Sequence, residues 1–302
     1  MSGAVAAIDC GTNTIKLLVG EPPHAVLREM RMVRLGEGLD ASGRIGEAAL
    51  GRAFAAIDEY AAIIAEHDVP TERIRFCATS ASRDAENAAQ FVAGVRARLG
   101  VAPEVLSGAE EAALSFTGAV RHLRAEPAWP VLVVDIGGGS TELVLGDRSG
   151  PQSAHSMDIG SVRLHERHLA DDPPTAAQVE ALLADVDAAL AACPVPAAEA
   201  ATVVGVAGTV TTVAAAVLDL AAYDRAALDQ QVLDVDDVHA AVQRLVGLSV
   251  AERRELPYLH PGRADVIGAG ALIWSRVLEH AGVRQVVVSE CDILDGIAAS
   301  IG

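Results

Sequence analysis

The feature that most constrains the fold is a strand–turn–strand pattern that occurs twice in the chain. Residues 5–20 contain two apolar runs separated by a polar turn, and residues 132–146 repeat this arrangement at a constant spacing. Each copy carries Asp-x-Gly at the end of its first apolar run, with Asp9 in one and Asp135 in the other. The repeat predicts two domains, each opened by a β-hairpin. The turns also align, Gly11 with Gly137 and Thr14 with Ser140.

The rest of the chain alternates short β-rich runs with longer helical runs, which predicts an α/β fold. Capping boxes mark three helix starts, Ser107 with Glu110, Thr175 with Gln178 and Ser249 with Glu252. The expected strands cover residues 5–8, 16–20, 74–78, 131–135, 142–146, 203–206 and 286–289. The expected helices cover residues 47–67, 85–99, 110–123, 176–192, 238–248, 264–280 and 293–301.

A proline-containing segment at residues 124–130 interrupts this alternation just before the second hairpin. Such a break is typical of a linker between domains. We therefore expect a first domain of residues 1–124 together with 290–302, and a second domain of residues 125–289. The return of the final segment to the first domain is implied by the family resemblance given below.

The charge balance restricts the class of partner. The 302 residues include 23 Lys and Arg against 41 Asp and Glu, so the formal net charge is −18 at pH 7. A field of this sign repels nucleic acids and anionic membrane surfaces, and the sequence predicts neither as a partner. An anionic substrate would have to be held by local cations, backbone N–H groups and metal ions.

The cysteines and the apolar runs favour a cytoplasmic location. The four cysteines are far apart and form no Cys-x-x-Cys or Cys/His cluster, which favours free thiols. No leader pattern opens the chain. Residues 200–218 carry no charge, yet their glycines and threonines favour a strand, a turn and a helix over a membrane span.

The second turn, residues 137–141, has the composition of a phosphate-binding loop. Its three glycines permit the positive φ angles that bring several N–H groups onto one concave face, and Ser140 and Thr141 add hydroxyl donors. Tight hairpin turns use the same residue types without any ligand. Carboxylates beside such a loop repel phosphate unless a cation lies between them, so Asp9, Asp135 and Glu142 predict a bound Mg²⁺ or Mn²⁺.

Two Asp-x-Gly hairpins of this kind resemble those of the actin, sugar-kinase and heat-shock chaperone superfamily. Within it, the chain resembles the exopolyphosphatase and guanosine pentaphosphate phosphohydrolase (Ppx/GppA) family. The resemblance implies an α/β fold with two actin-like, ribonuclease H-like domains and an interdomain cleft. The resembling segments, in the family's order, are residues 7–19, 34–39, 78–83, 107–112, 134–142, 160–164 and 263–265.

Two departures from the family pattern stand out. The closing segment, residues 289–296, carries acids and Leu294 where the family comparison leads us to expect a glycine and a basic residue. The sequence also stops at Gly302, so we expect no counterpart of the extra C-terminal helical domain of longer members.

Hydrolysis requires a base that orients and deprotonates the attacking water. Glu110 and Glu111 are the candidates, and we favour Glu111, because the capping box engages Glu110 and because Glu111 aligns with the family's catalytic glutamate. The resemblance also implies that Asp9, Asp135 and Glu142 hold the metal ion. The implied phosphate contacts are Gly11, Thr12, Asn13, Thr14, Lys16, Arg34, Arg83, Gly137, Gly138, Gly139, Ser140, Thr141, Arg163, Gly208 and Thr209.

The function implied by the resemblance is release of terminal orthophosphate from polyphosphate. The net charge of −18 and the lack of a Lys/Arg run outside the motifs favour short chains as substrate. A guanosine pentaphosphate phosphohydrolase would share this site. The superfamily resemblance also leaves open an ATP-dependent kinase and a non-catalytic, nucleotide-binding actin-like protein. A homodimer is compatible with the sequence.

Overall fold

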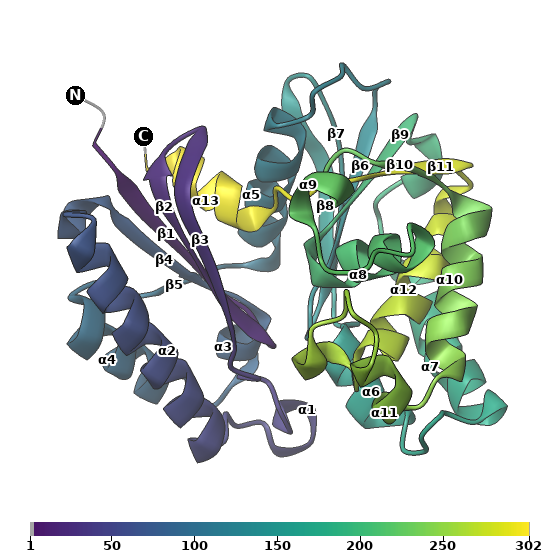
Figure 1. Cartoon of the computed structure of the whole chain (residues 1–302), viewed down its shortest axis with the longest axis horizontal. Helices are drawn as coiled ribbons and strands as arrows, with labels where there is room; N and C mark the ends of the chain where they lie inside the picture. The colour runs from purple at the N-terminus through teal and green to yellow at the C-terminus, as the bar shows by residue number, and fades with distance from the viewer. Residues whose placement is uncertain (1–2, 302) are drawn as a thin grey trace. The chain divides into compact units, whose positions relative to one another are not determined.

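The computed structural model describes residues 3–301, which divide into two compact units. The first unit comprises Met1–Gly118 and Ile293–Gly302, and the second comprises Ala119–Asp292. Each unit is a mixed β-sheet with helices packed on it (Figure 1), and each is described by itself. The sequence places the domain boundaries a few residues away, after residue 124 and after residue 289.

The sheet of the first unit has the strand order β3-β2-β1-β4-β5. Its first three strands form an antiparallel meander, whereas β4 is parallel to β1 and β5 is parallel to β4. The chain thus reaches β4 through a helical crossover. The strands are β1 (Val5–Cys10), β2 (Thr14–Glu21), β3 (His24–Met32), β4 (Ile74–Ala78) and β5 (Glu104–Val105).

Two apolar clusters cover the two faces of this sheet. On one face, Ile8 and Leu17 pack with α2 and α4, which lie side by side. On the other face, Val5 and Leu18 pack with Ile297 of α13, so the final helix belongs to this unit. The helices are α1 (Leu39–Ser42), α2 (Glu47–Glu66), η1 (Thr71–Arg73), α3 (Ser80–Asp84), α4 (Ala88–Leu99), α5 (Gly108–Arg121) and α13 (Ile293–Ser300).

The sheet of the second unit has the strand order β10-β11-β9-β6-β7-β8. Strands β6, β7 and β8 form an antiparallel meander, and β9 and β11 continue the sheet in parallel on the other side of β6. The strands are β6 (Val131–Ile136), β7 (Thr141–Asp147), β8 (Gly150–Met157), β9 (Thr202–Val206), β10 (Val232–Asp234) and β11 (Gln285–Val288).

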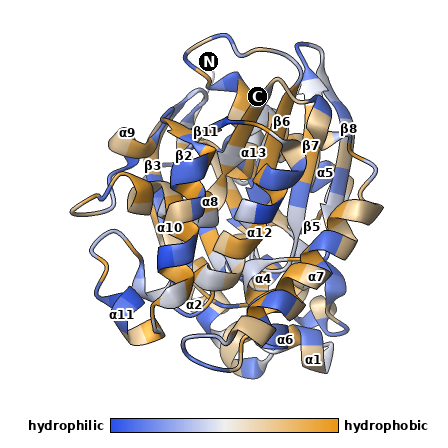
Figure 2. Cartoon of the chain, turned by 90° about the vertical axis from the view of Figure 1, so that its right-hand side faces the viewer, coloured by the Kyte–Doolittle hydropathy of each residue, from blue (hydrophilic) through white to orange (hydrophobic). Residues whose placement is uncertain are grey.

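One large apolar cluster fills the second unit, with the fully buried Trp274 of α12 among its members. In Figure 2, β6 and β7 are mainly hydrophobic, whereas α10 carries both kinds of residue. The helices are α6 (Ser161–His168), α7 (Ala176–Ala192), η2 (Ala197–Glu199), α8 (Ala207–Val217), α9 (Arg225–Leu228), α10 (Val235–Gly247), α11 (Val250–Arg254), η3 (Pro261–Arg263) and α12 (Ile267–Ala281).

The two sheets share one topology, which confirms the repeat predicted from the sequence. The order β3-β2-β1-β4-β5 corresponds to β8-β7-β6-β9-β11, with an antiparallel hairpin and parallel strands at matching places. The α/β class is confirmed as well. Among residues 3–301, no helix combines the length and the hydropathy needed to cross a membrane.

Candidate functional site

The first hairpin places a buried acid beside a lysine. Asp9 of β1 pairs with Lys16 of β2 in the antiparallel register, so both side chains lie on the same face of the sheet. Asp9 is only 5% exposed, and its Oδ2 lies 3.5 Å from Lys16 Nζ. The Gly11 N–H closes the turn by donating to the Thr14 carbonyl at 2.9 Å. The negative charge of Asp9 therefore has a cation next to it within this unit.

Residues 33–36 bind the carbonyl side of this turn. The N–H of Arg34 donates to the Asn13 carbonyl at 2.9 Å, and the N–H of Gly36 donates to the Thr12 carbonyl at 2.9 Å. A Cβ on Gly36 would lie 2.2 Å from Thr12 Cγ2, so this contact requires glycine. Arg34 has a φ of 47°, which is uncommon for a residue other than glycine. The predicted phosphate ligand Arg34 is thus fixed against the turn by its backbone.

The second hairpin repeats this geometry with a different charge. Asp135 of β6 pairs directly with Glu142 of β7, and the Gly137 N–H donates to the Ser140 carbonyl at 3.0 Å. Asp135 is 8% exposed and Glu142 is 2% exposed. The Ser156 hydroxyl donates to Glu142 Oε1 at 2.7 Å. Like charges directly opposite each other in a sheet are destabilising, and a cation between them removes that cost.

Helix α6 binds the carbonyl side of the glycine turn. The Ser161 N–H donates to the Gly137 carbonyl at 2.9 Å, and the Val162 N–H donates to the Gly138 carbonyl at 2.8 Å. The Gly139 carbonyl is also bound, because Arg163 Nε donates to it at 2.8 Å.

The amide groups of this turn point away from α6, because C=O and N–H are antiparallel in a trans peptide. The three carbonyls that α6 binds therefore direct the N–H groups of Gly138, Gly139 and Ser140 to the opposite side. Within the described part of the chain, these three groups donate to no protein acceptor. Convergent N–H groups of this kind form an anion-binding concavity.

The glycine turn does not use the positive φ angles that the sequence analysis expected. Positive φ angles occur at Gly38, Gly43, Gly100, Gly150 and Gly282, and not at residues 137–139, so that expectation was wrong. Steric contact requires glycine at residue 160, which packs against this turn. A Cβ on Gly160, just before α6, would lie 2.4 Å from the Gly138 carbonyl oxygen.

The turn hydroxyls are partly engaged in holding the fold. Thr141 is fully buried and donates to the Ile159 carbonyl at 2.6 Å. Thr12 Oγ1 and Ser80 Oγ lie 2.9 Å apart, which ties the first hairpin to α3. These two hydroxyls therefore stabilise the turns in addition to any contact with a ligand.

Glu111, the candidate base, forms an ion pair with a predicted phosphate ligand. Arg83 Nη1 lies 3.1 Å from Glu111 Oε2, and the same nitrogen donates to the Leu106 carbonyl at 3.0 Å. Glu111 is 8% exposed. Glu110 points elsewhere, because its carboxylate accepts from the N–H and the hydroxyl of Ser107 at 2.9 and 2.7 Å. The predicted capping box is thus confirmed.

The third turn brings in a residue to which the sequence analysis gave no role. Gly208 and Thr209 begin α8, directly after β9, and the preceding Ala207 has a φ of 66°. A Cβ on Gly208 would lie 2.4 Å from Cζ of Arg263, so the guanidinium rests on this glycine. Within residues 3–301, the Arg263 side chain makes no hydrogen bond to protein. Only its place in the resembling segment 263–265 pointed to it.

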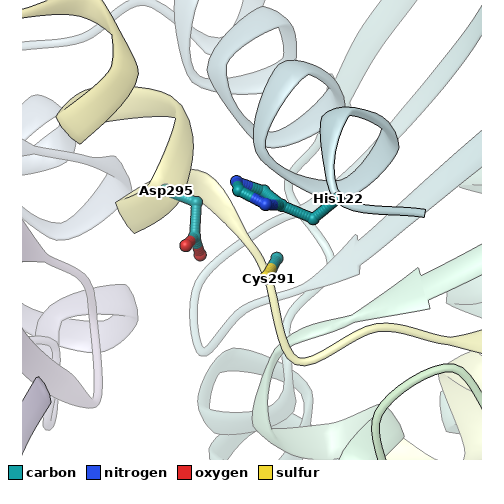
Figure 3. A group of neighbouring side chains, drawn as sticks. All are labelled: His122, Cys291 and Asp295. Atoms are coloured by element: carbon teal, nitrogen blue, oxygen red, sulfur yellow. The ribbon is translucent and has the colours of Figure 1, made fainter. Parts of the chain in front are cut away.

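Two further polar side chains, His122 and Cys291, lie near the two ends of the second unit's chain segment. A ring nitrogen of His122 and Cys291 Sγ lie within 4.8 Å of each other, and Figure 3 shows them with Asp295. Asp295 belongs to the first unit, where its carboxylate accepts from Arg28. We assign no metal site to these three side chains, because they belong to two units.

Comparison with known proteins gives consistent likenesses over nearly the whole chain. Residues 14–301 match the model of the Ppx/GppA phosphatase family. "Exopolyphosphatase 2" of Mycobacterium tuberculosis is 46% identical over 316 residues, which cover 98% of either chain.

Two solved structures extend these likenesses to the fold. The crystal structure of an exopolyphosphatase-like protein has a TM-score of 0.95 at 44% identity and covers 99% of this chain and 98% of its own. The Ppx/GppA protein of Aquifex aeolicus has a TM-score of 0.82 at 29% identity, over 99% and 97% of the two chains. The predicted α/β fold class with two sheet-containing units is confirmed. From the fold, the two hairpins and these matches, we conclude that the chain belongs to the Ppx/GppA phosphatase family.

Proposed function

We propose that this protein is an exopolyphosphatase that releases terminal orthophosphate from polyphosphate. The observation that carries the proposal is the second hairpin, where the buried acids Asp135 and Glu142 lie beside three N–H groups that point away from α6. The acids provide ligands for a cation, and the N–H groups provide donors for phosphate oxygens. The names of the similar exopolyphosphatases support the same substrate.

The family is generally dependent on a divalent metal ion, and the donor set here suits one. Asp135 and Glu142 offer carboxylate oxygens, which are the ligands that Mg²⁺ and Mn²⁺ prefer. We propose that these two residues hold the ion, with Asp9 contributing from the first hairpin. The ion-paired Lys16 already balances Asp9, so we expect Asp9 to contribute less. When bound, the ion neutralises phosphate charge and polarises the bond to be broken.

The chain's own residues supply the rest of the reaction in this proposal. Glu111 orients the attacking water and accepts its proton, and Arg83 holds a phosphate oxygen next to it. Glycine-turn N–H groups bind oxygens of the terminal phosphate, and the cations Lys16, Arg34 and Arg163 bind further along the substrate. Glu111 and Asp9 belong to the first unit, whereas Asp135 and Glu142 belong to the second, so the proposal requires both units to act on one substrate.

The test is phosphate release from polyphosphate, guanosine pentaphosphate and ATP, each measured with Mg²⁺, with Mn²⁺ and in excess chelator. We expect metal-dependent release from polyphosphate. Faster release from guanosine pentaphosphate would replace the proposed substrate with the nucleotide. Release that persists unchanged in chelator would contradict the metal role of Asp135 and Glu142.

A further inference from the structure

The acidic closing segment forms a polar cluster at one end of the second sheet. Glu290 follows β11, and only 10% of its side chain is exposed. The Tyr223 hydroxyl donates to Glu290 Oε1 at 2.5 Å, and Arg225 Nη2 donates to the Glu290 carbonyl at 2.7 Å. The Glu290 N–H donates to Asp229 Oδ1 at 3.1 Å. Glu290 is thus held in place by three residues of the segment around α9.

This cluster lies beside the third turn. The N–H of Ser289 donates to the Gly205 carbonyl at 2.9 Å, which fixes the start of the closing segment to the end of β9, just before Gly208. Tyr223 reaches the same helix, because its hydroxyl lies 3.4 Å from Thr211 Oγ1 of α8. Glu290 therefore lies next to the first turns of α8, on which the Arg263 guanidinium rests.

The charges on this cluster act on Arg263. Burial lowers the pKa of Arg263, and Tyr223, Glu290 and Asp292 oppose that shift. Burial also raises the pKa of Glu290, although the Tyr223 hydroxyl and Arg225, whose Nε lies 3.7 Å from Glu290 Oε2, oppose that shift. A buried carboxylate near a guanidinium cancels much of the attraction that the cation would exert on an anion.

Resting on the proposed function, we propose that Arg263 binds polyphosphate at the third turn and that Glu290, through its charge, weakens this binding and so sets how strongly substrate is held there. Glu290 touches no reacting atom in the proposed reaction. Its carboxylate reduces the positive charge available at the third turn, so substrate units bound there contribute little affinity.

The variant Glu290→Gln removes the charge and keeps an oxygen that accepts from Tyr223. We expect the KM for polyphosphate to fall about 3- to 10-fold, the size of effect expected from one partly screened charge, while kcat stays close to that of the wild type. The matched control is Asp229→Asn, which makes the same change at a carboxylate that accepts from the Glu290 N–H and is not among the groups named as acting on Arg263. This control should leave the KM unchanged.

A double-mutant cycle with Arg263→Gln identifies the cause. If Glu290 acts through Arg263, then Glu290→Gln should no longer lower the KM once Arg263 is replaced. An equal decrease in both backgrounds, or none in either, would overturn the proposal. Asp292→Asn gives a second variant if Glu290→Gln folds poorly, and we expect a shift in the same direction.

The proposal can be separated from the proposed function by a binding measurement. Calorimetry with inorganic tripolyphosphate in chelator reports affinity without turnover. Tighter binding to Glu290→Gln that requires Arg263 would support the role of Glu290 even if wild-type protein releases no phosphate. Active wild-type protein whose tripolyphosphate affinity does not change in Glu290→Gln would keep the proposed function and remove this inference.

Discussion

Lys16 and Glu142 occupy the same position in the two hairpins, each directly across the strand pair from a buried aspartate. In the first unit the pairing is Asp9 with Lys16, and the opposite charges lie 3.5 Å apart. In the second unit the pairing is Asp135 with Glu142, and both members are acids. The duplicated fold has therefore kept its geometry while the charge at one position differs. In our proposal a divalent ion adds electrostatic compensation at the second hairpin.

This difference predicts how Glu142→Gln affects stability. Without metal, the variant should melt at a higher temperature than the wild type, because one of two facing carboxylates is gone while the oxygen that accepts from Ser156 remains. Adding Mg²⁺ should raise the melting temperature of the wild type only. A bound ion at one hundred times its Kd contributes about 2.7 kcal/mol. Equal stabilisation of both proteins by Mg²⁺ would place the ion elsewhere.

Glu111→Gln should lower kcat roughly 100- to 10,000-fold, because the amide cannot accept the proton of the attacking water. Its fold should persist, since the contact with Arg83 can be kept as a neutral hydrogen bond. Phosphate release under saturating polyphosphate measures this effect. Glu110→Gln is the matched control at the adjacent position and should retain kcat, because Glu110 is engaged by Ser107. Activity lost in the control and retained in Glu111→Gln would reverse the assignment.

The Ser107–Glu110 capping box predicts how the stability of the fold depends on pH in the acid range. Hydrogen bonds from the N–H and the hydroxyl of Ser107 hold the pKa of Glu110 below its usual 4.5. The folded-state value is therefore the lower one, so the stabilisation is complete above pH of about 4.5 and is lost as the pH falls through the folded-state pKa. Melting temperatures of Glu110→Gln should fall less steeply over this acid range than those of the wild type.

The capping box of Thr175 and Gln178 provides the control for this acid dependence. Thr175 is capped by Gln178, whose amide does not titrate. Gln178→Ala should therefore lower the melting temperature by a similar amount at every pH. If the wild type and Glu110→Gln lose stability in parallel on acidification, the Ser107–Glu110 contact does not cause the acid sensitivity.

Gly160→Ala tests the close approach of α6 to the glycine turn. The new Cβ would lie 2.4 Å from the Gly138 carbonyl oxygen, so either the turn or α6 must shift. We expect a stability loss of about 1–3 kcal/mol and weaker phosphate binding, because the three N–H groups lose their common direction. Gly247→Ala is the control in the same unit, since a Cβ there meets no atom within 4 Å. Equal effects of the two substitutions in urea unfolding would contradict the packing argument.

The strands that the sequence analysis missed share one physical property. Strands β3, β5, β8 and β10 are the four edges of the two sheets, whereas every expected strand has a counterpart in the structure. An edge strand pairs on one side only and need not be buried on both faces, so its sequence lacks the continuous apolar run of an inner strand. The polar run of β8, Gly150–Met157, is an example.

Site residues were predictable where the local sequence determines the geometry. The repeated apolar pattern identified the two hairpins and their polar turns, and the spacing of Ser107 and Glu110 identified the capping box. The contact between Gly208 and Arg263 joins segments that are far apart in the sequence, and no local pattern encodes it. The ion pair between Arg83 and Glu111 is of the same kind.

The distribution of charge predicts how activity depends on polyphosphate length. Each added unit carries about one negative charge, and at physiological salt the Debye length is about 8 Å, so cations act only near the substrate. Most arginines outside the candidate site are paired with acids within residues 3–301, as in Arg31–Glu59, Arg75–Glu104 and Arg276–Asp187. The formal net charge of −18 then repels the distal part of a long polymer. We therefore expect affinity to saturate at short chains and the enzyme to dissociate often during hydrolysis.

The measurement is kcat/KM for polyphosphates of defined length, at a fixed concentration of chain ends and at two salt concentrations. We expect kcat/KM to stay constant with length beyond short chains. Added salt should lower the affinity for short chains and leave this length dependence nearly unchanged, because the binding cations act over less than a Debye length. A steep rise that continues into long chains and disappears at high salt would reveal a basic track that these arginine pairings do not provide. Such a track would need cations from more than one copy of the chain, and its dependence on protein concentration would identify that origin.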